Sequence, residues 1–153
     1  MKSVYKVLAF LIAAEVAIQA AMMGFAVAGL GIWVDKEGGV LDKATFESEP
    51  DFTGAVGFMV HGINGMMVIP LLALVFLIVS FFAKVPGGVK WAALVLLAVV
   101  VQVALGIYGH ENAVFGMLHG LNALLLFSLA FMAGKRVTTV TPDRQVVGER
   151  ELV

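Results

Sequence analysis

The tetrapeptide His-Gly-x-Asn occurs twice in this chain, at His61–Asn64 and at His119–Asn122, each time near the start of a long apolar segment. An ionisable side chain is costly inside a membrane and usually serves a function there. A neutral imidazole is a common axial ligand of haem iron. The two matched copies therefore predict that His61 and His119 are the two metal ligands of one site.

The residues that follow each histidine also suit a bound haem. Gly62 and Gly120 remove side-chain bulk where a flat macrocycle would approach the backbone, although such glycines also allow close helix packing. Asn64 and Asn122 are expected either to orient an imidazole or to hydrogen-bond the edge of the cofactor. Because the chain has no cysteine, covalent attachment is excluded, and the predicted cofactor is a non-covalent haem b.

The composition places these motifs in an integral membrane protein. Of the 153 residues, 61% are hydrophobic and 14% are charged, and the mean hydropathy is +1.00. A soluble domain of this size needs more polar surface. The lipid bilayer is therefore the expected surrounding, and the net charge of −1 predicts no nucleic-acid partner.

Four segments are long enough to cross a bilayer as helices, which takes about 20 apolar residues. In lipid the backbone must satisfy its own hydrogen bonds, and no segment alternates like a barrel strand, so helices are predicted. The spans are 7–34, 56–83, 90–108 and 113–134, within a bundle of residues 1–136 that has an acidic outer loop at 35–55 and is followed by a tail at 137–153.

The positive charges predict the orientation of the bundle, because lysine and arginine favour the cytoplasmic side of short loops. The side that holds the 35–55 loop has only Lys36 and Lys43. Both termini are therefore predicted to be cytoplasmic. The lysines and arginines on their side are Lys2, Lys6, Lys84, Lys90, Lys135, Arg136, Arg144 and Arg150.

With this orientation the two histidines lie at one depth. His61 is five residues past Val56, and His119 is six past Ala113. At about 1.5 Å per residue, both lie about 7–9 Å below the outer helix ends. A ligand held between the second and fourth helices of a bundle needs this arrangement.

The chain also shows signs of an internal duplication. The first predicted helix carries Gln19 and then Gly24, and the third carries Gln102 and then Gly106. The second and fourth helices carry the histidine tetrapeptide. We therefore predict an all-α, integral membrane four-helix bundle built from two helical-hairpin repeats.

The segment Val101–Gly106, followed by a short turn and then Leu118–Ala123, resembles a helix pair of the haem A synthase family. Each half of that family is a four-helix bundle with histidines on its second and fourth helices near the outer face. His61 and His119 match those positions, so the resemblance implies a bundle that holds a haem. It also implies a homodimer, in which two bundles stand for the two halves.

Over about residues 5–136 the chain more closely resembles a small bacterial four-helix membrane family of unassigned function, through Val27–Gly31, His61 and Leu118–Ala123. This resemblance implies a multi-pass protein of the bacterial plasma membrane. Haem A synthases carry a catalytic glutamate about one turn before the histidine of the second helix. Here residues 57–60 contain no carboxylate, so haem-modifying catalysis is not expected.

The first functional hypothesis is a b-type haem protein in electron transfer or haem handling. Two histidine ligands leave no open iron position, which favours electron transfer over oxygen chemistry. One haem near the outer face does not span a hydrocarbon core of about 30 Å, so a quinone or a redox partner protein is expected.

Two other hypotheses stay open. In one, Glu15, Gln19, Gln102 and the histidines line a path for a proton, metal ion or small solute. In the other, the protein is an accessory subunit whose histidines make interhelical hydrogen bonds. His110, in the outer turn, is either a solvated residue or an alternative ligand.

Overall fold

The computed structural model describes residues 1–48 and 50–137, which contain helices and no β-strand. Four helical segments are long and apolar enough to cross a membrane, so the protein is a multi-pass, all-α membrane protein. The elements are α1 (Lys2–Lys36), α2 (Lys43–Glu47), α3 (Val56–Ile63), the π-helical turn η1 (Asn64–Val68), α4 (Ile69–Ala83), α5 (Gly88–Gly109) and α6 (Ala113–Lys135).

The four predicted helical segments are confirmed, with one clear difference in length. Helix α1 has 35 residues, or about 52 Å at about 1.5 Å per residue, which exceeds the hydrocarbon thickness of about 30 Å. The second span is one continuous rod made of α3, η1 and α4. Residues 138–153, which make up nearly all of the predicted tail, lie outside the described part of the chain.

The local sequence explains where α4 ends and where α5 and α6 begin. Helix α4 ends at Ala83; the next residue, Lys84, has a left-handed conformation (φ 52°), and Gly87 (φ +68°) precedes α5. Pro86 lies between them and cannot continue a helix. At the other end, the side chain of Asn112 accepts a hydrogen bond from the Val114 N–H and caps α6.

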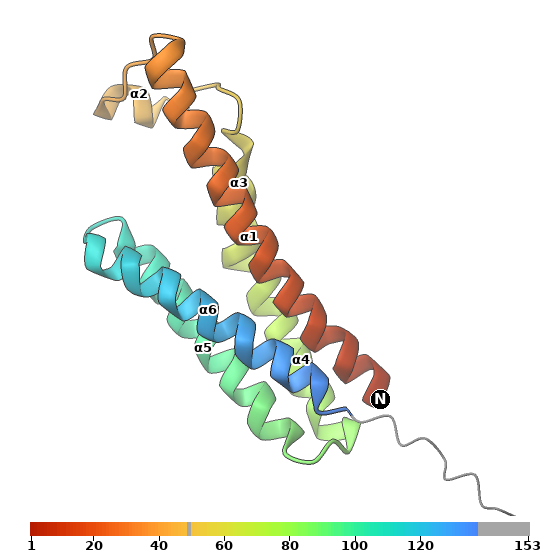
Figure 1. Ribbon diagram of the computed structural model, residues 1–153. Helices are drawn as coiled ribbons and strands as arrows, with labels where there is room; N and C mark the ends of the chain where they lie inside the picture. The colour runs from red at the N-terminus through yellow and green to blue at the C-terminus, as the bar shows by residue number, and fades with distance from the viewer. Residues whose placement is uncertain (49, 138–153) are drawn as a thin grey trace, which may run out of the picture.

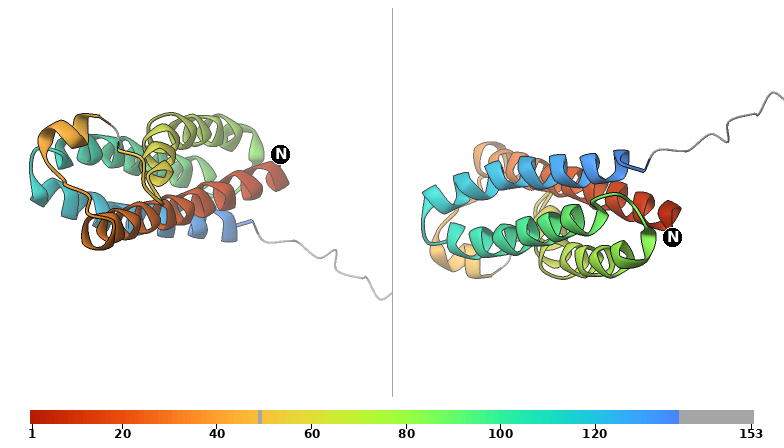
Figure 2. Two further views of the ribbon diagram at one scale, coloured as in Figure 1. Left: turned by 90° about the horizontal axis from the view of Figure 1, so that it is seen from above. Right: turned by 90° about the horizontal axis from the view of Figure 1, so that it is seen from below.

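The long helices form a ring. Helix α1 packs against α4 and α6, and α5 packs against the same two helices (Figures 1 and 2). The rod of α3, η1 and α4 and the helix α6 are therefore diagonal neighbours across the bundle. This diagonal is the one that carries His61 and His119.

The bundle is packed at one end and open at the other. We call the end with the N-terminus the terminal end, and the end with the α5–α6 turn the loop end. Figure 1 shows that α1 and α3 diverge from α5 and α6 toward the loop end. The largest fully buried side chains are Tyr5, Ile12, Phe76, Val95, Val99 and Leu126.

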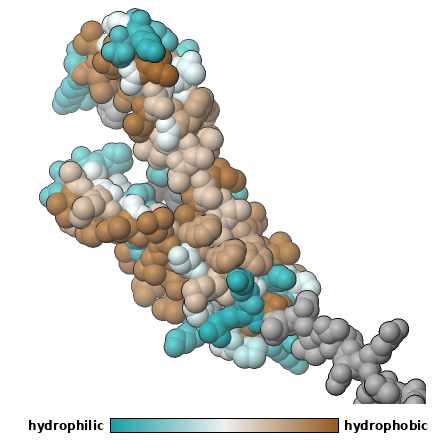
Figure 3. All heavy atoms as spheres, viewed as in Figure 1, coloured by the Kyte–Doolittle hydropathy of each residue, from teal (hydrophilic) through white to brown (hydrophobic). Residues whose placement is uncertain are grey.

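The outer surface of the helices is apolar (Figure 3). Exposed side chains such as Leu71, Val100 and Leu124 would be unfavourable in water, and they suit contact with lipid. Figure 3 also shows the hollow that separates the α1–α3 arm from the α5–α6 arm.

The loop between α1 and α3 folds along α1. The ring of Phe52 stacks on Trp33 at 5.7 Å between centroids and meets Phe58 at 6.4 Å. The loop approaches α1 so closely that a Cβ on Gly29 would overlap the Thr53 carbonyl oxygen. These contacts fix the start of α3 against the far end of α1.

Candidate functional site

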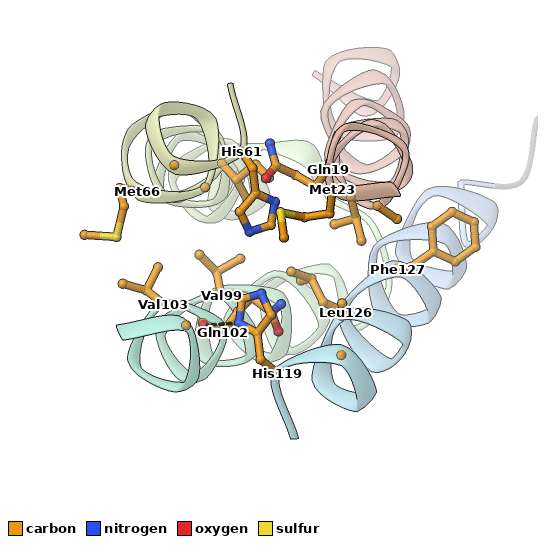
Figure 4. Close-up of a pocket in the computed structure, with 18 of the residues that line it drawn as sticks. Gln19, Met23, His61, Met66, Val99, Gln102, Val103, His119, Leu126 and Phe127 are labelled. Atoms are coloured by element: carbon orange, nitrogen blue, oxygen red, sulfur yellow. Dashed lines mark hydrogen bonds between the residues drawn. The ribbon is translucent and has the colours of Figure 1, made fainter. Parts of the chain in front are cut away.

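The structure brings the two predicted histidines together. His61 on α3 and His119 on α6 point toward one another across the space between the helices (Figure 4). Their ring centroids are 5.9 Å apart, and the ring planes meet at 64°. Two residues separated by 58 positions in the sequence thus form one imidazole pair, as their matched depth predicted.

Both rings line a cavity of about 700 Å³. Pockets for small molecules and cofactors span about 300–1,000 Å³ and are mostly apolar with a few polar groups. The walls here are mainly aliphatic side chains, methionines and glycines from all four long helices. The polar side chains in the lining are Gln19, His61, Gln102, His110 and His119.

A hydrogen bond fixes the orientation of His119. Its Nδ1 lies 3.0 Å from the backbone carbonyl oxygen of Gln102 on α5. A carbonyl oxygen can only accept, so Nδ1 donates and Nε2 of the neutral ring keeps its lone pair. Histidines that bind metals usually donate the other ring N–H to such a partner. His119 therefore has the tautomer that a metal ligand needs.

Gly106 leaves the space that His119 occupies. A Cβ at this position would lie 3.1 Å from Cε1 and 3.2 Å from Nδ1 of the imidazole. Because these distances are shorter than an ordinary contact, any side chain here would displace the ring. The sequence drew attention to Gly106 only as a sign of duplication, and its role in seating His119 depends on how closely α5 and α6 pack.

Asn122 forms hydrogen bonds to Gln102 and Ala98 on α5. Its Nδ2 donates to the Gln102 side-chain Oε1 at 2.7 Å and to the Ala98 carbonyl oxygen at 2.9 Å. Asn122 is not among the residues that line the cavity. In the described structure Asn122 therefore bonds the side chain of Gln102, whose backbone carbonyl oxygen accepts from His119.

His61 is less constrained. The Gln19 backbone carbonyl is close to its ring, but its buried Nδ1 has no hydrogen-bond partner among the described residues. Asn64 donates from Nδ2 to Glu15 Oε2 at 2.7 Å and, like Asn122, does not line the cavity. Glu15, the one acidic residue within the predicted spans, thus binds the asparagine of the first tetrapeptide.

Gly62 and Gly120 both line the cavity. A Cβ added to either would meet no atom of the described structure within 4 Å. These two glycines are therefore not required for helix packing, whereas a Cβ on Gly109 would lie 3.3 Å from the Gly116 backbone and would crowd the packing of α5 against α6. The open space beside each histidine belongs to the cavity.

Sequence reasoning missed the π-helical turn η1, which directly follows His61. Its wider hydrogen bond runs from the Ile69 N–H to the Asn64 carbonyl oxygen. Pro70, the next residue, has no N–H to donate to the preceding turn, which removes one α-helical bond and favours an irregularity there. Pro70 inside an apolar span was the available sequence signal.

This turn determines which way His61 points. Ile69, Ala73 and Phe76 follow His61 by 8, 12 and 15 residues, and all three are buried in the core. In a regular α-helix, at about 100° per residue, they would lie about 60–120° away from the histidine. A π-turn absorbs one residue, which brings the three to within about 40° of His61.

Helix α6 reaches the same arrangement without a π-turn. Leu126, Ala130 and Ala133 follow His119 by 7, 11 and 14 residues, one fewer in each case. All three are fully buried. Each histidine therefore lies on the same side of its helix as the buried core residues that follow it. In α6 a regular helix produces this alignment, and in the rod η1 produces it.

The comparisons with known proteins add no relative: no protein-family model, curated protein or solved structure matches this chain.

Proposed function

We propose that this protein binds haem b non-covalently between His61 and His119 and serves in electron transfer at the membrane. The observation that carries the proposal is the opposed imidazole pair, with centroids 5.9 Å apart in a largely apolar cavity. The hydrogen bond that leaves Nε2 of His119 free to bind a metal adds to it. The resemblance of both histidine positions to one half of haem A synthase points the same way.

The spacing of the pair suits a shared metal ion. Taking about 2.0 Å for a metal–imidazole bond and about 1.2 Å from nitrogen to ring centroid, two opposed ligands on one ion have centroids about 6.4 Å apart. The observed 5.9 Å is shorter by about half an ångström. His61, whose buried Nδ1 has no hydrogen-bond partner among the described residues, is the less constrained of the two rings.

The surroundings also suit a macrocycle. Gly62 and Gly120 leave open space beside each imidazole, where a side chain would otherwise project into the cavity. A haem held there by both histidines would supply a one-electron Fe(III)/Fe(II) couple. The chain's own contribution is to hold the imidazoles, exclude water with apolar walls and fix the His119 tautomer through Gln102.

The contacts around the two histidines support the proposed duplication into hairpin repeats. In each half an asparagine three residues after the histidine donates to the first helix of the pair, to Glu15 in one case and to Ala98 in the other. Glu15 and Ala98 each lie four residues before a glutamine. The two halves thus share helix order, contact positions and a core face that begins at the histidine.

The excess of lysine and arginine at the terminal end supports an orientation with both termini in the cytoplasm. The proposed haem then lies near the outer face, and electrons reach or leave it through a quinone or a redox partner protein. A bacterial plasma membrane and a homodimer complete the proposal, and they rest on the resemblance alone.

The competing assignment is an accessory subunit in which the histidines only join helices. The hydrogen bond from His119 to the Gln102 carbonyl is the observation in its favour. It predicts that each histidine contributes to stability and that no chromophore is bound. The presence or absence of a bound haem chromophore therefore distinguishes the two assignments.

The decisive measurement is the reduced-minus-oxidised absorption spectrum of protein purified after expression with haem supplied. The wild type should show the bands of a six-coordinate haem, and His61→Ala and His119→Ala should each lose them. His110→Ala is the matched control, because this third histidine also lines the cavity but does not belong to the pair. A wild type without haem bands, or full retention of the bands by both pair variants, would refute the proposal.

A further inference from the structure

Gln19 on α1 has a buried side chain with no partner. Its exposed fraction is 7%, and neither Nε2 nor Oε1 has a hydrogen-bond partner among the described residues. The side chain lines the cavity beside His61 (Figure 4). A buried amide without partners lowers stability, and native structures retain such a group mainly where a ligand or water completes it.

The equivalent glutamine of the other half is already paired. Oε1 of Gln102 accepts from Asn122 at 2.7 Å. The corresponding asparagine, Asn64, donates at 2.7 Å to Glu15, whereas position 98 holds an alanine that offers only its backbone. Asn64 therefore donates to Glu15 and not to Gln19, whereas Asn122 donates to Gln102 in the other half. The amide of Gln19 stays free to bind a ligand in the cavity.

The amide lies on the terminal-end side of the histidine pair. Gly65 is one turn beyond His61 in that direction, and a Cβ there would lie 3.6 Å from Gln19 Oε1. Side chains on a helix tilt toward its N-terminus, which for α1 is also the terminal end. Gly65 and Gln19 both line the cavity, so no side chain on Gly65 shields the amide from a ligand.

We propose that Gln19 is a specificity-determining residue that hydrogen-bonds an oxygen on the edge of the macrocycle facing the terminal end. This inference rests on the proposed haem site. A carbonyl oxygen on that edge accepts from Nε2, whereas a hydrocarbon edge leaves the amide unpaired. Gln19 therefore adds affinity for a haem that carries an oxygen-bearing substituent at this edge, and it adds none for haem b when a vinyl group lies there, so the site binds both.

The test compares two haems on protein purified without haem, each titrated by its absorption band. Protohaem carries vinyl groups, and diacetyldeuterohaem carries acetyl groups in their place. The wild type should bind the diacetyl form about tenfold more tightly than Gln19→Met does, because a buried hydrogen bond of this kind changes affinity by about that factor. Protohaem affinity should be nearly the same for both proteins.

Met23→Leu is the matched control. Met23 lies one turn from Gln19 on α1 and lines the same cavity, but it makes no hydrogen bond in the described structure. This substitution should leave the wild type's relative preference for the two haems unchanged. A second readout is the resonance Raman stretch of the acetyl carbonyl, which should lie at lower frequency in the wild type than in Gln19→Met.

The outcomes separate the two proposals. If the wild type binds neither haem, both the haem site and the role of Gln19 are overturned. If it binds both haems, but Gln19→Met changes neither relative affinity nor carbonyl frequency, the haem site stands. In that case the role of Gln19 is overturned, and the amide is completed by water only.

Discussion

The π-helical turn after His61 predicts that one deletion in a membrane-spanning helix is tolerated. Met67 lies in η1, and its side chain is 67% exposed. Removing it leaves Ile69 seven positions after His61, the same spacing that separates Leu126 from His119. The rod can then keep the α-helical register without the extra residue of η1, and His61 is not turned away from the cavity.

The matched control is deletion of Leu125 from α6, where no π-turn holds an extra residue. Leu125 is also largely exposed, at 53%, so the loss of apolar contact is comparable. This deletion rotates His119 by about 100° relative to the core face below it. At a side-chain radius of about 5–6 Å, the ring moves by about 8 Å.

That displacement exceeds the 5.9 Å between the two ring centroids, so the pair cannot form. The assay is the reduced-minus-oxidised haem spectrum, with thermal unfolding of the same preparations as a check on folding. The Met67 deletion should keep a six-coordinate spectrum, and the Leu125 deletion should lose it. Loss of the spectrum in a folded Met67 deletion, with retention in the Leu125 deletion, would refute the register argument.

Three further outcomes are expected from single substitutions. Gly106→Ala places a Cβ 3.1 Å from the His119 ring, which should displace the ring, destabilise the protein by about 1–3 kcal/mol and weaken haem binding in a spectral titration. Asn122→Ala removes two hydrogen bonds and leaves Gln102 Oε1 unpaired, so the unfolding free energy should fall by about 1–3 kcal/mol; an unchanged melting temperature would contradict this. Gln19→Met should raise the melting temperature of the haem-free protein, because it removes two unpaired buried atoms; a lower melting temperature would show that the amide is already satisfied.

The sequence by itself determined the fold class and the identity of the paired residues. Hydropathy over four segments required helices, because an apolar segment in lipid can satisfy its backbone only within itself. The repeated tetrapeptides also placed His61 and His119 at one depth, since depth along a straight helix follows directly from residue count. Neither inference needed a contact between helices.

Only the tertiary structure decided how the site is built. The partner of each asparagine, the fit of His119 against Gly106 and the unpaired amide of Gln19 all depend on which helix faces which. The direction of His61 depends on one extra residue absorbed in η1, which hydropathy does not register because both faces of the rod are apolar. The depth of a residue in the membrane depends on its own helix alone, whereas the neighbours that its side chain meets depend on how several helices pack together.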